Sequence, residues 1–491
     1  MSTVEAEQGL LTMLIGGERV GAASGETIEA RDPATGELLG RFPRGDAADV
    51  DAAVAAAVAA YPQWRRTPAL ERAAHLDRLA DLIAEHADEL ALLDVRDNGS
   101  PIREMRNDAH IAVAQLRYFA GIALEARGET VDTGPDRLNY TLRQPFGVVG
   151  RIIPFNHPLM FAATKIAAPL AAGNTTIVKP SEHTSLSALR LADLLAEAFP
   201  PGVANVVTGY GDEAGEALVG HPQVRRLAFI GSVEIGLAIQ RRAAASTVKT
   251  VSLELGGKNA LAVFPDADLD LAVEGALRGM NFTWQGQSCG STSRLLVHES
   301  LHEEFVARLA GRVEGLKSGS PVDEATDTGA IVHRGQLEKV LSYLEIGREE
   351  GAEVVAGGGV ASGPGLESGV FVRPTVFDRV DPYGRLAQEE IFGPVLAVMS
   401  FADYEEAIAI ANSVSYGLTG SVYTRDLATA HRWADEIEAG YVWVNDSSKH
   451  FIGVPFGGVK NSGVGREESF EELLSYTEAK NVNVNLHSRS V

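Results

Sequence analysis

The only cysteine of the 491-residue chain, Cys289, is the first residue to consider for chemistry. It lies in Gly286-Gln287-Ser288-Cys289-Gly290, which also fits the G-x-S-x-G pattern of serine hydrolases. Such a serine needs a strand directly before it, whereas residues 268–280 have helical periodicity and residues 281–285 form a polar and aromatic loop. Because a few per cent of a thiol is already thiolate near neutral pH, it is the better nucleophile. We therefore predict that Cys289, rather than Ser288, is the nucleophile.

A second pattern is that of a zinc site. His298-Glu299-Ser300-Leu301-His302 matches H-E-x-x-H, which on one helix would place two imidazoles on one face. Residues 295–297 instead predict a strand that runs into His298, and Ser300 with Glu303 predicts a capping box that starts a helix after it. The two histidines would then belong to different elements, so we expect no metal site.

Two glycine turns are candidates for binding a phosphate. Residues 209–214 (GYGDEA) fit G-x-G-x-x-A after a strand-like segment, but small residues are common at such turns for steric reasons, so we favour a plain turn. At Gly231 and Ser232, a strand-like segment (227–230) runs into an apolar helix (233–244). The free N–H groups at the start of that helix would suit a pyrophosphate.

The elements that must position these residues alternate between strands and helices. Strand-like runs are expected at 147–153, 175–179, 204–207, 227–230, 251–255, 295–297, 395–400 and 441–445. Residues 186–198 predict a helix, and residues 70–96 predict one long amphipathic helix. This alternation indicates an α/β protein with parallel sheets covered by helices on both faces. A second alternation of strands and helices begins after Gly256 and Gly257, where we expect a domain boundary.

Three other segments allow predictions about strand pairing and loops. Residues 137–143 and 481–486 alternate without enough apolar surface for core strands, so we expect them to pair with each other or with a partner chain. The glycine-rich residues 356–369 predict a surface loop, with strand-like sequence resuming at Val370.

Composition excludes several classes of protein. With 43 Lys and Arg against 66 Asp and Glu, the net charge of −23 would repel nucleic acid. No apolar stretch reaches the ~18 residues of a membrane span. The first eleven residues hold two Glu and no basic residue, which disfavours a secretory signal, and one cysteine excludes an internal disulfide. We expect a cytoplasmic protein with no membrane or nucleic-acid partner.

Phe282, Gly286, Gln287 and Cys289 resemble the cysteine motif of the NAD(P)-dependent aldehyde dehydrogenase superfamily. The family's other motifs follow in its order over nearly the whole chain. They are PFNHP (154–158), KPSE (179–182), GSVEIG (231–236), ELGGK (254–258), EEIFGPV (389–395) and PFGGVKNSGVGRE (455–467). The chain is therefore identified as a member of this family.

The resemblance implies an aldehyde dehydrogenase-like α/β fold, with two Rossmann-type, doubly wound parallel-sheet domains and a small β arm for oligomerisation. Residues 1–126 and 147–255 would form the NAD-binding domain, and residues 256–462 the catalytic domain. Residues 127–146 and 470–491 would form the arm of a homodimer or homotetramer.

The resemblance also implies the catalytic residues. The Cys289 thiolate would add to an aldehyde carbon, and the Asn156 side chain with the Cys289 backbone N–H would stabilise the resulting oxyanion. After hydride loss, Glu254 would be the general base for hydrolysis of the acyl-thioester. Lys165 and Glu467 match family positions of a proton relay or of a support for this base, and a structural ion pair is the alternative.

NAD is the cofactor that the resemblance implies. Its binding residues would be Ile152, Pro154, Phe155, Lys179, Ser181, Glu182, Gly231, Ser232, Leu255, Gly256, Glu390 and Phe392. Glu390 and Phe392 would hold the nicotinamide ribose. Glu182 would accept hydrogen bonds from both adenosine ribose hydroxyls and repel a 2′-phosphate, so NAD is favoured over NADP.

Alignment to the family assigns six residues to the substrate tunnel: His157, Met160, Phe161, Phe282, Trp284 and Phe456. The chain departs from the family at Phe155, where Trp is common, at His157, where Phe or Tyr is common, and at Trp284, where Asn is frequent. This apolar and aromatic set suits an uncharged aldehyde, aromatic ones included.

The sequence therefore predicts a non-acylating, NAD-dependent aldehyde dehydrogenase without a metal, acting on a small-molecule aldehyde. Two alternatives stay open. One is an ester or thioester hydrolase that uses Cys289 or Ser288 without a cofactor. The other is a structural protein that keeps the fold but has lost turnover.

Overall fold

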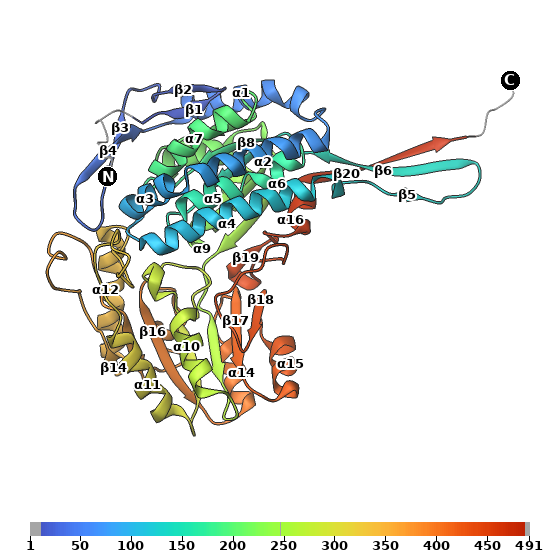
Figure 1. The fold of residues 1–491 in the computed structure, drawn as a ribbon. Coiled ribbons are helices and arrows are strands. Elements are labelled where there is room, and N and C mark those ends of the chain that lie inside the picture. The colour runs from blue at the N-terminus through green and yellow to red at the C-terminus, as the bar shows by residue number, and fades with distance from the viewer. Residues whose placement is uncertain (1–10, 246, 487–491) are drawn as a thin grey trace, which may run out of the picture.

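The computed structural model describes residues 11–245 and 247–486. Two helix-covered sheets form its body, and a narrow β arm projects from one side (Figure 1). The first sheet has the strand order β19-β11-β10-β7-β8-β9-β1-β2. Its five central strands run parallel, and antiparallel strands lie at both edges. The strands are β1 (Met13–Ile15), β2 (Glu18–Val20), β7 (Val148–Ile152), β8 (Thr175–Lys179), β9 (Ala204–Val206), β10 (Val224–Gly231), β11 (Thr250–Leu255) and β19 (Gly463–Val464).

Both faces of this sheet are buried, as the run of β-branched residues predicts. Successive side chains of a strand point to opposite faces. Val149 and Val178 accordingly pack in one apolar cluster, while their neighbours Val148 and Ile177 pack in another. The second cluster is covered by α1 (Ala47–Trp64), α8 (Glu216–Gly220) and α9 (Val233–Ala244).

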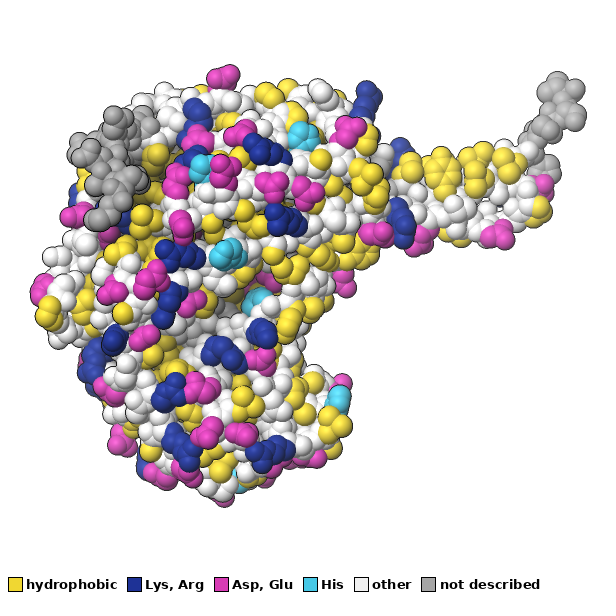
Figure 2. All heavy atoms as spheres, in the orientation of Figure 1, with side chains coloured by type: hydrophobic (Ala, Val, Ile, Leu, Met, Phe, Trp, Pro, Cys, Tyr) yellow, Lys and Arg dark blue, Asp and Glu magenta, His cyan; other side chains and the backbone are white. Residues whose placement is uncertain are grey.

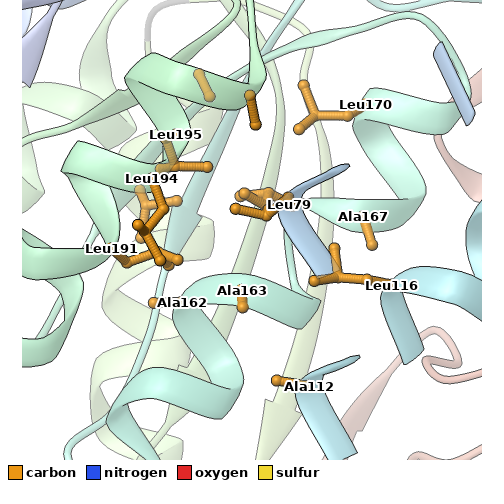
Figure 3. Packing of buried hydrophobic residues seen from close by; sticks show 14 of the residues in the cluster. Leu79, Ala112, Leu116, Ala162, Ala163, Ala167, Leu170, Leu191, Leu194 and Leu195 are labelled. Carbon is orange, nitrogen blue, oxygen red and sulfur yellow. The ribbon is translucent and has the colours of Figure 1, made fainter. Parts of the chain in front are cut away.

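The other face carries a layer of five helices with an interior of leucine and alanine (Figure 3). These helices are α2 (Ala69–Glu85), α4 (Ile102–Gly121), α5 (Pro158–Thr164), α6 (Ala167–Ala171) and α7 (Leu186–Ala198). Leu79 of α2 and Leu116 of α4 are fully buried there beside Ala163 of α5. Close packing leaves few voids in such an interior, so α4 and α5 are rigid supports for the side chains on their other faces.

The second sheet has the order β14-β15-β16-β13-β12-β17-β18, and only β14 runs antiparallel. Its strands are β12 (Ala260–Val263), β13 (Arg294–His298), β14 (Glu353–Ala356), β15 (Thr375–Asp378), β16 (Val395–Phe401), β17 (Thr419–Tyr423) and β18 (Tyr441–Val444). It too is buried on both faces, since Ala260 and Ala262 pack in one cluster and Leu261 and Val263 in the other. The surrounding helices are α10 (Leu269–Gly279), α11 (His302–Glu314), α12 (Arg334–Glu349), α14 (Tyr404–Asn412) and α15 (Leu427–Glu436).

The arm is a three-stranded antiparallel sheet of β5 (Thr130–Val131), β6 (Arg137–Pro145) and β20 (Thr477–Asn485). Thr141 pairs with Asn481, so the two alternating segments pair with each other, one of the two outcomes expected from the sequence. Hydrophobic side chains form a row along the arm (Figure 2). Val131, Leu138 and Leu142 are 41 to 48% exposed.

The remaining elements are short or peripheral. They are β3 (Thr27–Arg31), β4 (Leu38–Pro43), α3 (Ala87–Asn98), α13 (Arg385–Gln388), α16 (Phe470–Ser475), the 3-10 turns Ala123–Glu125, Phe282–Trp284 and Lys460–Ser462, and the π-helical turn Gly211–Gly215. That π-helical turn lies in the GYGDEA segment. Among the described residues, no helix combines the length and apolarity needed to cross a membrane.

Three local predictions were wrong. Residues 70–96 form two helices, because the backbone of His86 leaves the helical region (φ −104°, ψ 15°) and α3 turns to pack on α4, α5 and α7. Helix α11 begins after His298 as expected, but its N-cap is Leu301, and Ser300 Oγ hydrogen-bonds His298 Nδ1 instead of capping the helix. Strand β15 begins at Thr375 rather than at Val370, whose N–H donates to Pro33 O in a loop.

Candidate active site

The parallel strands of the first sheet end at one edge, where the chemistry-bearing residues gather. Glu254 of β11 lies opposite Ile230 of β10, and Ile152 of β7 lies opposite Lys179 of β8. Ligands of open α/β sheets bind outside the carboxyl ends of their strands. The sheet edge that faces the second sheet is therefore where a site is expected.

A cavity with a volume of about 390 Å³ lies there. Four of its lining residues are predicted catalytic residues from distant parts of the chain: Cys289, Glu254, Lys165 and Glu467. Five predicted substrate residues also line it: His157, Met160, Phe161, Trp284 and Phe456. Pockets of this volume hold small organic ligands.

Phe282 is not among the residues that line this cavity, in contrast to its assignment by alignment. It is 2% exposed and packs with Met280 and Leu295 in a core cluster of the second sheet. The apolar ring enters that core because Phe282 begins the 3-10 turn two residues after Met280, which is buried in the same cluster.

The loop that carries Cys289 is tightly constrained. Three of its residues have left-handed backbone conformations: Asn281 (φ 54°), Gln285 (φ 53°) and Gly286 (φ 64°). A Cβ at Gly286 would collide with the carbonyl of Gly393, so only glycine fits. Asn259 Nδ2 donates to the carbonyl of Cys289 at 2.7 Å, which ties the loop to the start of β12.

The Cys289 thiol and the Glu254 carboxyl perturb each other. Burial, followed by the charge of Glu254, raises the pKa of the Cys289 thiol well above its ordinary value. Burial and the neighbouring Glu467 raise the pKa of Glu254 to about 8. Glu254 Oε1 is buried without a hydrogen-bond partner. A carboxyl whose pKa lies near the working pH is suited to accept and release a proton.

Lys165 and Glu467 form an ion pair on the same wall of the cavity. Lys165 Nζ lies 2.8 Å from Glu467 Oε2, and Arg151 Nη2 lies 3.0 Å from Glu467 Oε1. Although burial opposes ionisation, these two cations hold the pKa of Glu467 down at about 2. Arg151 also donates to the Tyr476 hydroxyl. Glu467 is therefore a fixed anion beside Glu254.

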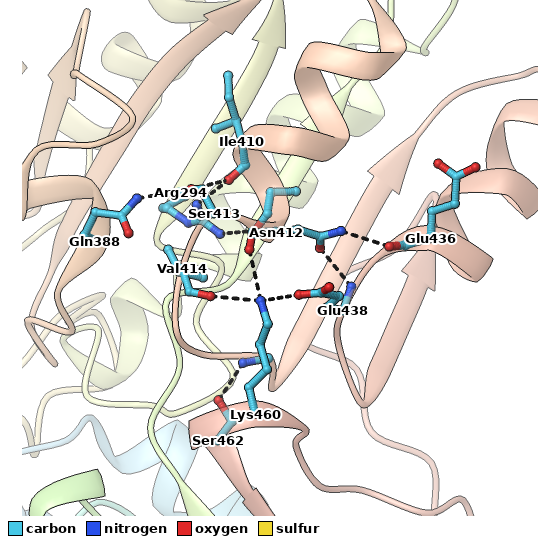
Figure 4. A network of polar contacts seen from close by, with 12 residues as sticks. Arg294, Gln388, Ile410, Asn412, Ser413, Val414, Glu436, Glu438, Lys460 and Ser462 are labelled. Atoms are coloured by element: carbon cyan, nitrogen blue, oxygen red, sulfur yellow. Dashed lines mark hydrogen bonds and ion pairs between the residues drawn. The ribbon is translucent and has the colours of Figure 1, made fainter.

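The segment that carries Phe456 and Glu467 is anchored by a polar network around Lys460 (Figure 4). Lys460 Nζ donates to the carbonyls of Asn412 and Val414, each at 2.9 Å, and pairs with Glu438. Ser462 Oγ donates to Gly256 O at 2.7 Å and accepts from Gly417 N–H at 2.9 Å. The network joins the second sheet to Gly256, the residue directly after the end of β11.

Asn156 is 3% exposed and, unlike its neighbour His157, is not among the residues that line the cavity. Its Oδ1 makes no hydrogen bond, and its backbone segment is held by Asn98, whose Nδ2 donates to Phe155 O at 2.6 Å. No hydrogen bond joins Asn156 to Cys289 in the described residues, so the oxyanion role stays a prediction.

The predicted cofactor residues fall on the same sheet edge. Lys179 Nζ lies 3.3 Å from Glu182 Oε2 and donates to Pro180 O at 3.1 Å. Despite partial burial, this ammonium keeps the pKa of Glu182 below its ordinary value. Ser232 caps α9, with its side chain accepting from Ile235 N–H at 3.4 Å. The first N–H groups of a helix have no intrahelical acceptor, so they are available to an anion.

The second sheet contributes Glu390 and Phe392. Glu390 Oε1 accepts from Gly257 N–H at 3.1 Å, and a Cβ at Gly256 would collide with this carboxylate. Phe392 has φ 58° and lies 5.6 Å from the ring of Phe155 at the end of β7. Residues of both sheets thus meet at this edge.

Several polar residues of the cavity were missed from the sequence. Asn107, Asp108 and Gln115 come from α4, and Ser448, Lys449, His450 and Glu468 come from the loops after β18. Asp108 could have been found from the sequence. It lies on the same helix face as the buried Met105 and Ala112, and a charged residue on such a face is unusual. The cavity is therefore more polar than the aligned residues indicated.

The H-E-x-x-H residues do not face each other. His298 Nε2 bonds Ala402 O at 3.0 Å, and His302 Nε2 bonds Asp378 Oδ1 at 2.7 Å. The described residues contain no group of three or more His, Cys, Asp or Glu that could hold a metal ion.

Comparison with known proteins gives a consistent result. The model of the "Aldehyde dehydrogenase family" matches residues 20–482. The aldehyde dehydrogenase tropH of Talaromyces stipitatus is 48% identical over 466 residues, 93% of this chain and 90% of that protein. Hydroxyisobutyraldehyde dehydrogenase of Mycolicibacterium austroafricanum is 43% identical, covering 96% of this chain and 94% of that protein. The NAD⁺ complex of an aldehyde dehydrogenase from Bacillus cereus has a TM-score of 0.95 and 43% identity, covering 98% and 97% of the two chains.

Proposed function

The chain belongs to the aldehyde dehydrogenase family, and from this premise we propose that it oxidises an aldehyde to the free carboxylic acid with NAD. The observation that carries the proposal is the cavity in which the lone thiol, Cys289, faces Glu254 beside the Lys165–Glu467 pair. A nucleophile, a carboxyl with a pKa near 8 and a fixed ion pair are what a covalent oxidation followed by hydrolysis needs.

In the proposed mechanism, the Cys289 sulfur attacks the aldehyde carbon and a tetrahedral oxyanion forms. The side-chain amide of Asn156 and the backbone N–H of Cys289 donate to that oxyanion. Loss of one such donor costs ~10² to 10³ in rate. Burial of Cys289 makes its ionisation expensive, so ionised Glu254 is the neighbouring group able to take the thiol proton.

The residues at the sheet edge fit a dinucleotide. The free start of α9 suits a pyrophosphate, and we propose that the carboxylate of Glu182, whose side chain is 27% exposed, meets the adenosine ribose. When bound, NAD supplies a hydride acceptor. Gly256 leaves room for the Glu390 carboxylate, which we propose holds the second ribose, with Phe392 limiting the nicotinamide ring.

Release of the acid requires water, and Glu254 takes the proton of that water as it attacks the acyl-thioester. Lys165 and Glu467 shift the pKa of Glu254 in opposite directions. The charge of Glu467 raises this pKa, and the charge of Lys165 lowers it. The product is the carboxylic acid, which makes the enzyme non-acylating.

The domain division and assembly are part of the proposal. The cofactor-binding, catalytic and arm segments keep the boundaries given above, and the protein acts in the cytoplasm. The arm's row of exposed Val131, Leu138 and Leu142 supports a role in joining copies into a dimer or tetramer.

The first substrate class to test is uncharged aldehydes, aromatic ones included, because Phe161, Trp284 and Phe456 line the cavity. One of the two relatives is named for hydroxyisobutyraldehyde and the other only as an aldehyde dehydrogenase, so their names do not select one substrate for this chain.

A test of the function follows the absorbance of reduced cofactor with purified protein, NAD and a panel of aliphatic, aromatic and charged aldehydes. Turnover that requires NAD and yields the acid supports the proposal. Hydrolysis of a 4-nitrophenyl ester without any NAD-dependent aldehyde oxidation would favour the hydrolase alternative. No histidine hydrogen-bonds Ser288 or Cys289 in the described residues, which disfavours that alternative.

A further inference from the structure

We propose that His157 and Asp108 form a subsite for a hydroxyl group on the tail of the aldehyde, so that hydroxylated aldehydes are the preferred substrates. This inference rests on the proposed function and deepens it. It begins with one departure from the family, a histidine where a phenylalanine or tyrosine is common.

The pair is built into the cavity wall. His157 Nδ1 lies 2.7 Å from Asp108 Oδ2, and the two side chains are 13% and 2% exposed. The His157 ring packs against Phe161 at 5.4 Å and Trp284 at 5.6 Å between ring centroids. Asp108 is held on the buried face of α4, one turn before Ala112 of the leucine and alanine layer. The imidazole is therefore clamped in one orientation.

The second ring nitrogen of His157 is free for a ligand. Nε2 makes no hydrogen bond to the described residues, and it is not among the enclosed polar atoms that lack a partner. His157 lines the same cavity as Cys289. Nδ1–H donates a hydrogen bond to the Asp108 carboxylate, which leaves Nε2 as the atom that meets the substrate.

A hydroxyl is the group that satisfies this nitrogen in both protonation states. Neutral imidazole with its proton on Nδ1 presents Nε2 as an acceptor, whereas imidazolium presents an Nε2–H donor. Burial opposes the charged form, but Asp108, with Asp94 and Glu104 behind it, raises the pKa of His157 above its ordinary value. A hydroxyl donates to the first form and accepts from the second.

A carboxylate tail fits less well. The cavity already holds the carboxylates of Asp108, Glu467 and Glu468; of its two lysines, Lys165 and Lys449, the first is paired with Glu467, and no arginine among the described residues lines it. A further anion would meet like charges at short range in a partly buried site. A purely apolar tail would leave the clamped nitrogen without a hydrogen bond once water is displaced, which is unfavourable.

The test compares aldehydes that differ only at the tail. Values of kcat/KM with NAD are measured for 3- and 4-hydroxybenzaldehyde against 3- and 4-methylbenzaldehyde, and for ω-hydroxyalkanals against alkanals with the same number of heavy atoms. Loss of a hydrogen bond to a charged or polarised group corresponds to a change of about ten- to a hundredfold. We expect the hydroxyl member of at least one pair to be preferred by that factor.

Two variants locate the preference. The His157→Phe variant has the phenylalanine that is common in the family. In this variant, the ratio of kcat/KM for the hydroxyl aldehyde to kcat/KM for its matched partner without the hydroxyl should fall to about one. Asp108→Asn should lower the ratio only partly, since it weakens the orientation of the ring. The matched control is His110→Phe, an exposed histidine on the same helix, which should leave the ratio unchanged.

Because the ratio compares two substrates on the same folded protein, a general loss of activity does not mimic it. A parent protein that oxidises aldehydes but shows a ratio near one for every pair would overturn the subsite while the proposed function stands. An unchanged ratio in His157→Phe would do the same. Absence of NAD-dependent oxidation for every aldehyde would instead overturn the proposed function.

Discussion

The side-chain amide of Asn259 donates hydrogen bonds to the carbonyls of Cys289, at 2.7 Å, and Ser291, at 3.0 Å. Its Oδ1 accepts from Thr419 N–H at 3.0 Å, so one side chain joins the nucleophile loop to β17. Asn259 directly follows the ELGGK segment, and it is 3% exposed. The orientation of the Cys289 peptide, and with it the N–H proposed for the oxyanion, depends on this residue.

Replacement of Asn259 by Ala should lower kcat about ten- to a hundredfold while the fold persists, because two backbone carbonyls lose their donor near the nucleophile. Steady-state kinetics and circular dichroism check this. Asn412→Ala is a matched control, since Asn412 also bonds two backbone groups of the second sheet, Glu436 O and Glu438 N–H, away from the cavity. Equal losses of kcat in the two variants would show that Asn259 acts only on stability.

Much of the fold could be predicted because strand and helix periods repeat so regularly. The predicted strand at 175–179 and the helix at 186–198 match β8 and α7 residue for residue. The break at His86 could not be predicted, since both flanking segments have helical periodicity and only packing on α4, α5 and α7 turns α3. Tertiary contacts there override local propensity.

The residues of the candidate site could likewise be predicted only in part. Cys289, Glu254, Lys165 and Glu467 were predicted from the resemblance to the family, and they line one cavity. Asp108 and His450 lie in no motif, and they enter the cavity from α4 and from the loop after β18. Sequence proximity does not indicate which loops meet across a sheet edge, so these polar neighbours emerge only in the structure.

Substitution of the nucleophile separates the two candidate chemistries. Cys289→Ala should abolish dehydrogenase turnover while NAD binding, measured by calorimetry, persists. Ser288→Ala should keep most of the activity, because Ser288 lines the cavity without a basic partner. The reverse pattern, an inactive Ser288→Ala and an active Cys289→Ala, would favour the hydrolase.

Glu254→Gln should give a burst of about one reduced cofactor per site and then stall, since hydride transfer precedes hydrolysis, and the burst should be slower than the first turnover of the parent because a neighbouring acceptor of the thiol proton is lost. Rapid-mixing absorbance measures the burst. Glu468→Gln, at another carboxylate of the cavity wall, is the comparison and should not stall. Complete loss of the burst in Glu254→Gln would contradict the predicted role in hydrolysis and would place the carboxyl before hydride transfer, and steady turnover would remove it from the mechanism.

The raised pKa of Glu254 also predicts a pH dependence. Its folded-state pKa of about 8 lies above the ordinary 4.5, so folding favours the protonated form. Below pH 4.5 both states are protonated. Between pH 4.5 and about 8 the unfolded state is ionised while the folded state keeps its proton, so the stability of the fold decreases over this range and the loss is complete above pH 8. Compared with the parent, Glu254→Gln should therefore gain Tm at pH 9 and little at pH 5. In the parent, kcat should rise through pH ~8 as the base ionises. An equal Tm difference at both pH values would contradict this assignment.

The choice of cofactor depends on Glu182 and its ion pair with Lys179. A 2′-phosphate ~4 Å from this carboxylate would meet repulsion of about 4 kcal/mol at an effective dielectric near 20. Lys179 Nζ, 3.3 Å from Glu182 Oε2, offsets part of that repulsion, so we expect NAD to be preferred over NADP by about ten- to a hundredfold in kcat/KM. Glu182→Gln should reduce the ratio of kcat/KM with NAD to kcat/KM with NADP, because the repelling charge is gone while the amide still accepts a hydrogen bond from a ribose hydroxyl. Glu197→Gln, an exposed glutamate paired with Arg78 at the end of α7, is the control and should leave the ratio unchanged. A parent that prefers NADP, or a ratio that Glu182→Gln does not move, would show that this carboxylate does not face the ribose.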